Sequence, residues 1–493
     1  MQYLWHDYET FGTRPALDRP CQFAAQRTDE NLDPVGEPVE WFCAPADDVL
    51  PRPFACLITG ITPQTARKLG KIEAEFARDV LALMMQPGTC SVGYNSLKFD
   101  DEVTRHLFYR NLLDPYEREY RNGNSRWDLI NLTRMCYALR PEGIEWPMTG
   151  QVGSSEVGGT TAAIRPSFRL QDLTRVNGID HADAHNALAD VRATIELARI
   201  IRKAQPRLYD WSLSLRDKQQ ARRLLDFESL VPVVHSSGHI SSTRGCTSVF
   251  LPIAPHPRND KSVIVFDLMG DAQALAQSDA QMIHDLVFTP HADLPEEVSR
   301  LPLKQIKWNA VPMLAPLSVL QGVDEARIGL DLAVCHENAA HLRRHIQTIR
   351  RQVRAAFDTE FGEETDPDFA LYSGFFNDSD RRLMQSIQRC SPEEIAGRKW
   401  QFDDHRLSTM LLRYRARNWP RSLSNDDWAT WRHDRRERLL QPAGSNFYGL
   451  EDFRTELSEA RLASVGNLPA QAILDELEVW SEELELETDI NHL

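Results

Sequence analysis

Two carboxylates near the start of the chain have a spacing that suits metal binding. Asp7 and Glu9 lie two residues apart in the segment Tyr3–Glu9, which predicts a strand. Side chains two apart on a strand point to the same face of the sheet, so both carboxylates can reach one ion. Taken alone the pattern also fits a solvated strand end, and it needs acidic partners from elsewhere to indicate chemistry.

Two later segments offer such partners. Asp100 follows the predicted strand Thr89–Tyr94 and opens a predicted helix, where helix capping is the alternative role. His185 and Asp190 stand five residues apart near the start of another predicted helix. Because positions five apart on an ideal helix diverge by roughly 140°, both face one site only if His185 precedes or opens the helix and Asp190 projects from its second turn. Capping or packing is the alternative for His185.

The four acidic residues Asp7, Glu9, Asp100 and Asp190 together match the needs of phosphodiester hydrolysis by two metal ions, which carboxylates hold roughly 3.5 to 4 Å apart. Mg²⁺ prefers oxygen ligands, and Mn²⁺ is the expected substitute. One ion would activate the attacking water, and the other would stabilise the leaving 3′ oxygen. His185 is then placed to accept the proton of that water as general base. The same residues would serve DNA or RNA.

A zinc site formed by histidines and cysteines is a less well supported interpretation than the carboxylate site. His181 and His185 are four residues apart, but no third ligand of zinc type lies nearby in the sequence. The eight cysteines are scattered and form no C-x-x-C pair. This usage is typical of a reducing compartment, and it predicts a cytoplasmic protein without disulfides.

The order of these motifs, Asp-x-Glu, then Phe-Asp after a Gly-Tyr-Asn strand end, then His-x4-Asp, resembles the DEDDh exonuclease superfamily. The sequence segments around these motifs resemble one branch of that superfamily, the bacterial exodeoxyribonuclease I family, over nearly the whole chain. They are His6–Gly12, Leu17–Pro20, Ile58–Pro63, Phe99–Arg105, Ser125–Asp128, Cys136–Gly143, Gln205–Tyr209, Leu371–Phe376 and Tyr414–Asn418.

The resemblance implies a Mg²⁺-dependent 3′ to 5′ exonuclease that releases 5′-mononucleotides from single-stranded DNA and serves DNA repair and recombination. Asp7, Glu9, Asp100 and Asp190 would be the metal ligands and His185 the general base. Five further residues, together with Glu9, would contact the DNA: Arg105, Tyr116, Tyr120, Arg134 and Arg169. A surface salt bridge is the alternative for each arginine. The family also implies a monomer that binds the acidic tail of single-stranded DNA-binding protein.

The elements that must position these residues alternate in type over the first 200 or so positions. We expect strands at Tyr3–Glu9, Cys21–Asp29, Val39–Ala44 and Thr89–Tyr94, and helices beginning near Pro63, Asp100 and His185. Such alternation predicts an α/β fold with a mixed sheet and flanking helices. The family resemblance implies that this is an RNase H-like domain. Residues 148–164, rich in Gly, Ser and Thr, predict a surface loop.

The remainder changes character twice. Short β-rich runs at Leu230–His235, Thr247–Ile253 and Ser262–Leu268 predict a small β domain, which the family makes SH3-like. After residue 335 an apolar helical period predicts an all-α region. We therefore predict an exonuclease domain at 1–203, an SH3-like domain at 204–354 and a helical domain at 355–493.

Composition limits the partners. The 493 residues carry a formal net charge of −16, which argues against a nucleic-acid ligand. However, residues 470–493 hold eight acidic residues and no Lys or Arg, whereas arginines gather near 343–354, so a positive groove is compatible with the acidic total. No apolar stretch is long enough to span a membrane, and the first seven residues do not predict a secretory signal.

Two other functions fit parts of the pattern. An RNA exonuclease or a proofreading subunit would share the catalytic residues, and only the wider resemblance favours DNA. A non-catalytic single-strand binder on the same fold would have no need of the five catalytic residues, all of which are present.

Overall fold

The computed structural model describes residues 1–493 except 151–163, 182–185, 291–292, 296–297, 360–361, 363, 443–446 and 488–493. The chain forms two compact units, and neither is continuous in sequence. The first comprises Met1–Ser125, Ala182–Arg192 and Gly362–Leu493, and the second comprises Arg126–His181 and Ala193–Phe361. In the described part of the chain, no helix combines the length and apolar character needed to cross a bilayer.

A five-stranded mixed sheet organises the first unit. Its order is β3-β2-β1-β4-β5, with β1 antiparallel to β2 and parallel to β4. The strands are β1 (Gln2–Thr10), β2 (Pro20–Thr28), β3 (Val39–Phe42), β4 (Thr89–Gly93) and β5 (Ser125–Asp128), the last of which crosses the boundary between the units. The four strands predicted from the sequence are confirmed.

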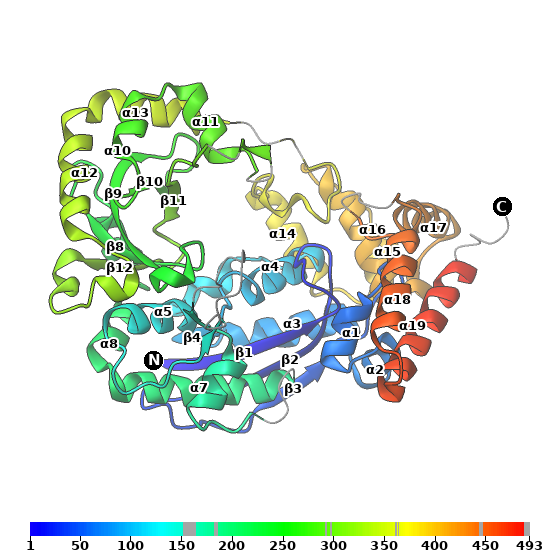
Figure 1. Ribbon diagram of the computed structural model, residues 1–493. Helices are drawn as coiled ribbons and strands as arrows, with labels where there is room; N and C mark the ends of the chain where they lie inside the picture. The colour runs from blue at the N-terminus through cyan, green and yellow to red at the C-terminus, as the bar shows by residue number, and fades with distance from the viewer. Residues whose placement is uncertain are drawn as a thin grey trace. The chain divides into compact units, whose positions relative to one another are not determined.

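Helices α3 (Glu73–Met84) and α4 (Asp100–Arg110) cover one face of this sheet, as Figure 1 shows. The apolar face of α3, with Phe76, Ala77 and Val80, packs on Leu4 and Tyr8 of β1. Because β1 alternates, Leu4 and Tyr8 leave Asp7 and Glu9 pointing to the opposite face. Two short helices precede α3, namely α1 (Pro53–Thr59) and α2 (Pro63–Leu69). Helix α7 (Ala187–Ala204) begins in this unit.

The C-terminal segment of the first unit is helical, as predicted. Its helices are α14 (Asp378–Ile387), α15 (Pro392–Gly397), α16 (Arg406–Asn418), α17 (Asn425–Leu439), α18 (Leu450–Ala463) and α19 (Leu468–Glu487). In Figure 1 the pair α18 and α19 lies against α1 and α2, which come from the other end of the chain.

The second unit contains a five-stranded antiparallel sheet in the order β11-β10-β9-β8-β12. Its strands are β8 (Val233–Ser236), β9 (Thr247–Pro255), β10 (Ser262–Asp267), β11 (Leu303–Lys307) and β12 (Met313–Pro316). The three β-rich runs predicted from the sequence form β8, β9 and β10. Helix α13 (Ile346–Ala356) packs on β9, so the region predicted to be helical after residue 335 begins within this unit.

The remaining elements of the second unit are mostly helices. They are α5 (Leu129–Leu139), α6 (Leu170–Val176), the rest of α7, α8 (Pro206–Ser214), α9 (Lys218–Leu224), α10 (Ala272–Gln277), α11 (Ala280–Phe288), α12 (Leu332–Arg344) and α13 (Ile346–Ala356). The two-residue strands β6 (Met148–Thr149) and β7 (Arg165–Pro166) pair with each other. Most of the predicted 148–164 loop, residues 151–163, lies outside the described residues.

Candidate active site

The catalytic candidates on β1 lie where the strand extends past its neighbour. The parallel pairing of β1 with β4 ends at Trp5 and Val92, so Asp7 and Glu9 continue beyond β4. On the other side β1 still pairs with β2, where Glu9 lies opposite Gln22. The carboxylates are therefore held by a rigid strand but are not closed in by β4.

Asp100 reaches this strand from the start of α4. The backbone N–H of Tyr8, which has no β4 partner at this position, donates to Asp100 Oδ1 at 3.1 Å. Gly93 ends β4 in a tight approach, since a Cβ there would lie 2.6 Å from Ser96 Cβ. Asp100 is 3% exposed and stands in the first turn of α4, where the helix dipole favours a negative charge.

Asp190 is brought to the site by the docking of α7 on β2. Asn186 caps the helix by accepting from the backbone N–H groups of Leu188 and Ala189, both at 3.1 Å. Ala187 N donates to Gln22 Oε1 at 3.3 Å, on the strand that pairs with Glu9. Since the helix begins at Ala187, Asp190 projects from its first turn rather than from the second turn expected from the sequence.

Asp7, Glu9 and Asp190 come together in one cluster. Ligand oxygens of these three residues lie within 4.8 Å of one another. Burial and the charges of Asp190 and Asp100 raise the pKa of Glu9 to about 8. Burial and the charges of Asp100, Glu9 and Asp190 hold the pKa of Asp7 well above its usual range. The structure thus concentrates negative charge that a divalent cation would neutralise, and the all-oxygen donor set suits Mg²⁺ or Mn²⁺.

His185 and the neighbouring Asp183 lie outside the described residues. The described chain resumes at Asn186, so the residue expected as general base immediately precedes the capped start of α7. His181 is described, and its Nδ1 lies 3.1 Å from Thr174 Oγ1.

The sequence reading missed a buried ion pair behind the site. Arg118, fully buried, donates to Asp101 Oδ1 at 2.5 Å, next to Asp100 in the chain. Burial and the Arg118 charge lower the pKa of His6 to about 4, which keeps this histidine neutral at neutral pH. Only the adjacency of Asp101 to Asp100 hinted at this pair, since Arg118 carries no motif of its own.

Besides Glu9, three of the expected DNA contacts lie in the first unit. Arg105 donates to Glu119 at 2.8 Å, also pairs with Glu102, and lies 5.4 Å from the ring centre of Tyr116. Tyr372, from the Leu371–Phe376 segment, accepts from Arg105 Nη1 at 3.2 Å. Tyr120 is 65% exposed. Arg105 and Tyr116 are therefore side by side, although the carboxylates occupy much of the hydrogen-bonding capacity of Arg105.

The other two expected contacts belong to the second unit. Arg134 donates to Asn131 Oδ1 at 2.7 Å and stacks 5.9 Å above the ring of Phe168. Its guanidinium also fills the space beside Gly238, where a Cβ would approach Arg134 Nη2 to 2.9 Å. Arg169 is exposed and precedes α6.

Three family models match the chain in succession. They are "Exonuclease" at residues 4–198, "Exonuclease I SH3-like domain" at 216–359 and "Exonuclease I C-terminal domain" at 365–484. The mixed sheet with its flanking helices, the SH3-like sheet and the C-terminal helices thus correspond to the three folds expected from the sequence.

Curated relatives cover most of the chain. Exodeoxyribonuclease I of Escherichia coli K12 is 44% identical over 437 residues, which is 88% of this chain and 89% of the relative. The enzyme of Haemophilus influenzae is 40% identical over 444 residues, 90% of this chain and 91% of the relative.

Solved structures give the same picture. Exonuclease I from Methylocaldum szegediense aligns with a TM-score of 0.90 and 44% identity, covering 98% of this chain and 99% of its own. E. coli exonuclease I in complex with a dA16 oligonucleotide aligns with a TM-score of 0.90, 41% identity and the same coverage. A zinc-bound form of the E. coli enzyme with single-stranded DNA aligns equally well, at a TM-score of 0.90 and 40% identity.

Proposed function

The chain belongs to the exodeoxyribonuclease I family and is an exonuclease, and we propose that it degrades single-stranded DNA from the 3′ end with two Mg²⁺ ions, releasing 5′-mononucleotides. The observation that carries the proposal is the cluster of Asp7, Glu9 and Asp190, with Asp100 beside it. Structures of the E. coli relative in complex with single-stranded DNA support the choice of substrate.

Four carboxylates would hold the ions. Asp7, Glu9 and Asp190 offer oxygens within reach of one ion, and Asp100 adds charge beside them. A bound divalent cation would supply a water of lowered pKa and would stabilise the oxygen that leaves. The raised pKa values of Asp7 and Glu9 favour the proposal, because they reflect repulsion between buried carboxylates that a bound cation would relieve.

The protein's own groups would orient this chemistry. The Tyr8 N–H fixes one oxygen of Asp100, and the contact of Ala187 with Gln22 ties the start of α7 to the strand opposite Glu9. His185, just before that helix, would accept the proton of the attacking water. Glu9 would also touch the terminal nucleotide.

Single-strand recognition would rest on arginines and aromatic rings. Guanidinium groups pair with phosphates, and ring faces stack on bases without reading sequence. Arg105, Tyr116 and Tyr120 in the first unit and Arg134 and Arg169 in the second are the proposed contacts. The cation–π pairs of Arg105 and Arg134 support these roles, because each guanidinium is held in place by a ring.

The wider role stays a proposal that follows from family membership. We propose a cytoplasmic monomer that trims single strands in DNA repair and recombination and that binds the acidic C-terminal tail of single-stranded DNA-binding protein. The domain boundaries at 203/204 and 354/355 also stay proposals. The matched segments end and begin near them, whereas the two compact units divide the chain differently.

A 5′-labelled single-stranded DNA oligomer incubated with the protein and Mg²⁺ tests the function. We expect stepwise shortening from the 3′ end, with the duplex intact and no cleavage in EDTA or by Asp7→Ala. A matched RNA oligomer cut more than about tenfold faster would contradict the substrate assignment. Binding without nucleotide release would leave only a binding role, and full activity of Asp7→Ala would mean that the site is wrong.

A further inference from the structure

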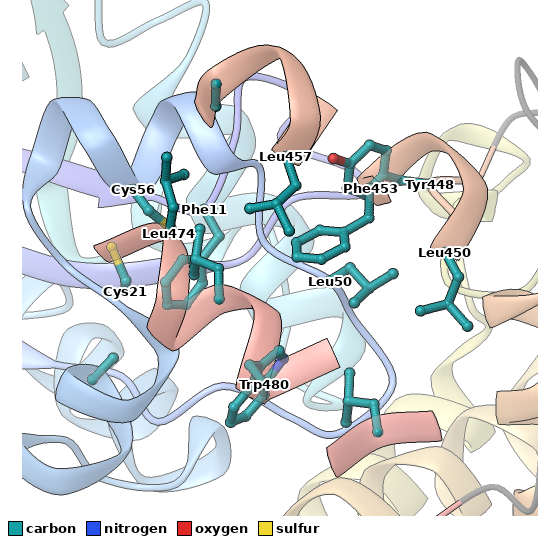
Figure 2. Close-up of a cluster of buried hydrophobic side chains, with 14 of the residues drawn as sticks. Phe11, Cys21, Leu50, Cys56, Tyr448, Leu450, Phe453, Leu457, Leu474 and Trp480 are labelled. Atoms are coloured by element: carbon teal, nitrogen blue, oxygen red, sulfur yellow. The ribbon is translucent and has the colours of Figure 1, made fainter. Parts of the chain in front are cut away.

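The segment that follows Glu9 is buried by the C-terminal helices. Phe11, two residues after Glu9, is 2% exposed and belongs to a core cluster whose other members come largely from α17, α18 and α19. Figure 2 shows the Phe11 ring among side chains from both ends of the chain, including Leu50, Phe453, Leu474 and Trp480. The segment that directly follows β1 and the C-terminal helices therefore share one core.

Backbone contacts make this segment tight. Phe11 N donates to Arg19 O at 2.9 Å, and Arg52 N donates to Phe11 O at 2.8 Å. Thr10 Oγ1 donates to Gly12 O at 2.5 Å. A Cβ at Gly12 would lie 2.3 Å from Asp18 Oδ2, so the turn closes directly on the Asp18 side chain. A shift of the Phe11–Arg19 segment would therefore be passed to Thr10 and Glu9.

A buried ion network locks the same segment to the helices. Asp48, with a fully buried side chain, accepts from Arg417 at 2.6 and 3.0 Å and from Arg438 at 3.1 Å. Arg19, which ends the segment, lies 3.9 Å from the same oxygen. Asp368 also accepts from Arg417, at 2.5 Å, and from Arg438, at 3.1 Å. Two carboxylates and three guanidiniums thus join the segment after β1 to α16 and α17.

The two aspartates of this network, Asp48 and Asp368, remain ionised at neutral pH. Burial alone would raise the pKa of Asp48, but the Arg417, Arg19 and Arg438 guanidiniums outweigh it and hold the pKa well below its usual range. The same balance, with Arg417, Arg438 and Arg413, lowers the pKa of Asp368. A buried carboxylate with these partners is fixed in position, since moving it would separate desolvated charges.

We propose that Asp48, through Arg19, Arg417 and Arg438, and Phe11, through the shared core, are positioning residues that set the place of Glu9 in the metal site. The C-terminal helices then complete the active site rather than only extend the molecule. The proposal rests on Glu9 being a metal ligand, as proposed above. It follows that loosening this network weakens metal binding and turnover at a site whose ligands are all intact.

The test compares Asp48→Asn with Asp404→Asn in the full-length protein. Asp404 is also an aspartate paired with an arginine of α16, Arg406, at 2.8 Å, but it contacts neither the Phe11–Arg19 segment nor the network. The readouts are kcat and KM on a single-stranded DNA oligomer, the Mg²⁺ concentration for half-maximal rate, and Mn²⁺ binding without DNA.

For Asp48→Asn we expect kcat to fall by about tenfold or more and the half-maximal Mg²⁺ concentration to rise several-fold, because a displacement below about 1 Å has effects of this order. KM for DNA should stay within about twofold, and Asp404→Asn should change none of these values by more than about twofold. Phe11→Leu, which keeps the core apolar, should change kcat and Mg²⁺ dependence in the same direction as Asp48→Asn but by a smaller factor. It replaces Asp48→Asn as the test variant if that protein fails to fold.

The inference would be overturned if folded Asp48→Asn kept the wild-type kcat and metal dependence, even with a lower melting temperature. If Asp48→Asn fails to fold, the same result in folded Phe11→Leu would overturn it. Equal effects in Asp404→Asn would do the same. Failure of the wild type to hydrolyse DNA would instead count against the proposed function, so the two failures are distinguishable.

Discussion

Adding Mg²⁺ to the metal-free protein at neutral pH is expected to release protons. Glu9 has its pKa raised to about 8 by burial and by Asp190 and Asp100, so the metal-free site keeps a proton there at pH 7. Coordination requires the ionised carboxylate, and binding therefore expels that proton. Asp7, whose pKa is also raised by burial and by its acidic neighbours, should add to the release.

The size of the effect follows from the pKa. With a pKa of about 8, Glu9 is protonated in about nine-tenths of the molecules at pH 7 and in about one-tenth at pH 9. Its share of the release should therefore be about 0.9 proton per site at pH 7 and about 0.1 at pH 9. An unperturbed glutamate would release almost none at either pH.

Isothermal titration calorimetry in buffers of different ionisation enthalpy measures the number of protons released. Glu9→Gln at saturating Mg²⁺ is the control, and it should release at least about 0.9 proton fewer than the wild type at pH 7, since removing the Glu9 charge also lowers the pKa of Asp7. A wild type that differs from Glu9→Gln by less than about 0.3 proton at pH 7 would refute the electrostatic reasoning.

Three other perturbations test separate parts of the argument. In EDTA the folded protein holds the Glu9 proton up to a higher pH than the unfolded chain does, so Glu9 protonation contributes stability at about pH 5 that is lost as the pH rises to about 8. The melting temperature of the wild type relative to that of Glu9→Gln should therefore fall over this range, and parallel curves would contradict this. Asp190→Asn should lower the hydrolysis rate by about 100-fold or more with single-strand affinity, measured by fluorescence anisotropy, nearly unchanged, and retained activity would remove Asp190 from the site. Arg134→Ala should weaken DNA binding several-fold and should reduce the dependence of DNA affinity on salt concentration by about one phosphate contact. Arg175 is an exposed arginine paired with Asp172, and Arg175→Ala should change neither quantity. Equal losses in the two variants would indicate a general charge effect.

Much of the fold was predictable because it depends on local periods. Alternation over Tyr3–Glu9 predicted both the strand and the shared face of Asp7 and Glu9, and the apolar period after Ala187 predicted α7. Strands β11 and β12 were missed, because Leu303–Lys307 and Met313–Pro316 are short and show no clear alternation.

The site was predictable as a set of residue types but not as a geometry. The sequence by itself determined which acids were available and how Asp7 and Glu9 are oriented, and its resemblance to the family predicted that Asp100 and Asp190 join them. Only the tertiary structure decided that Tyr8 N holds Asp100, that Gln22 meets the start of α7, and that Asp48 binds Arg417 and Arg438. The physical reason is range: a local pattern reports on neighbours within a turn or a strand, whereas pairing across more than 350 residues depends on how the whole chain buries its apolar surface and compensates the charges enclosed with it.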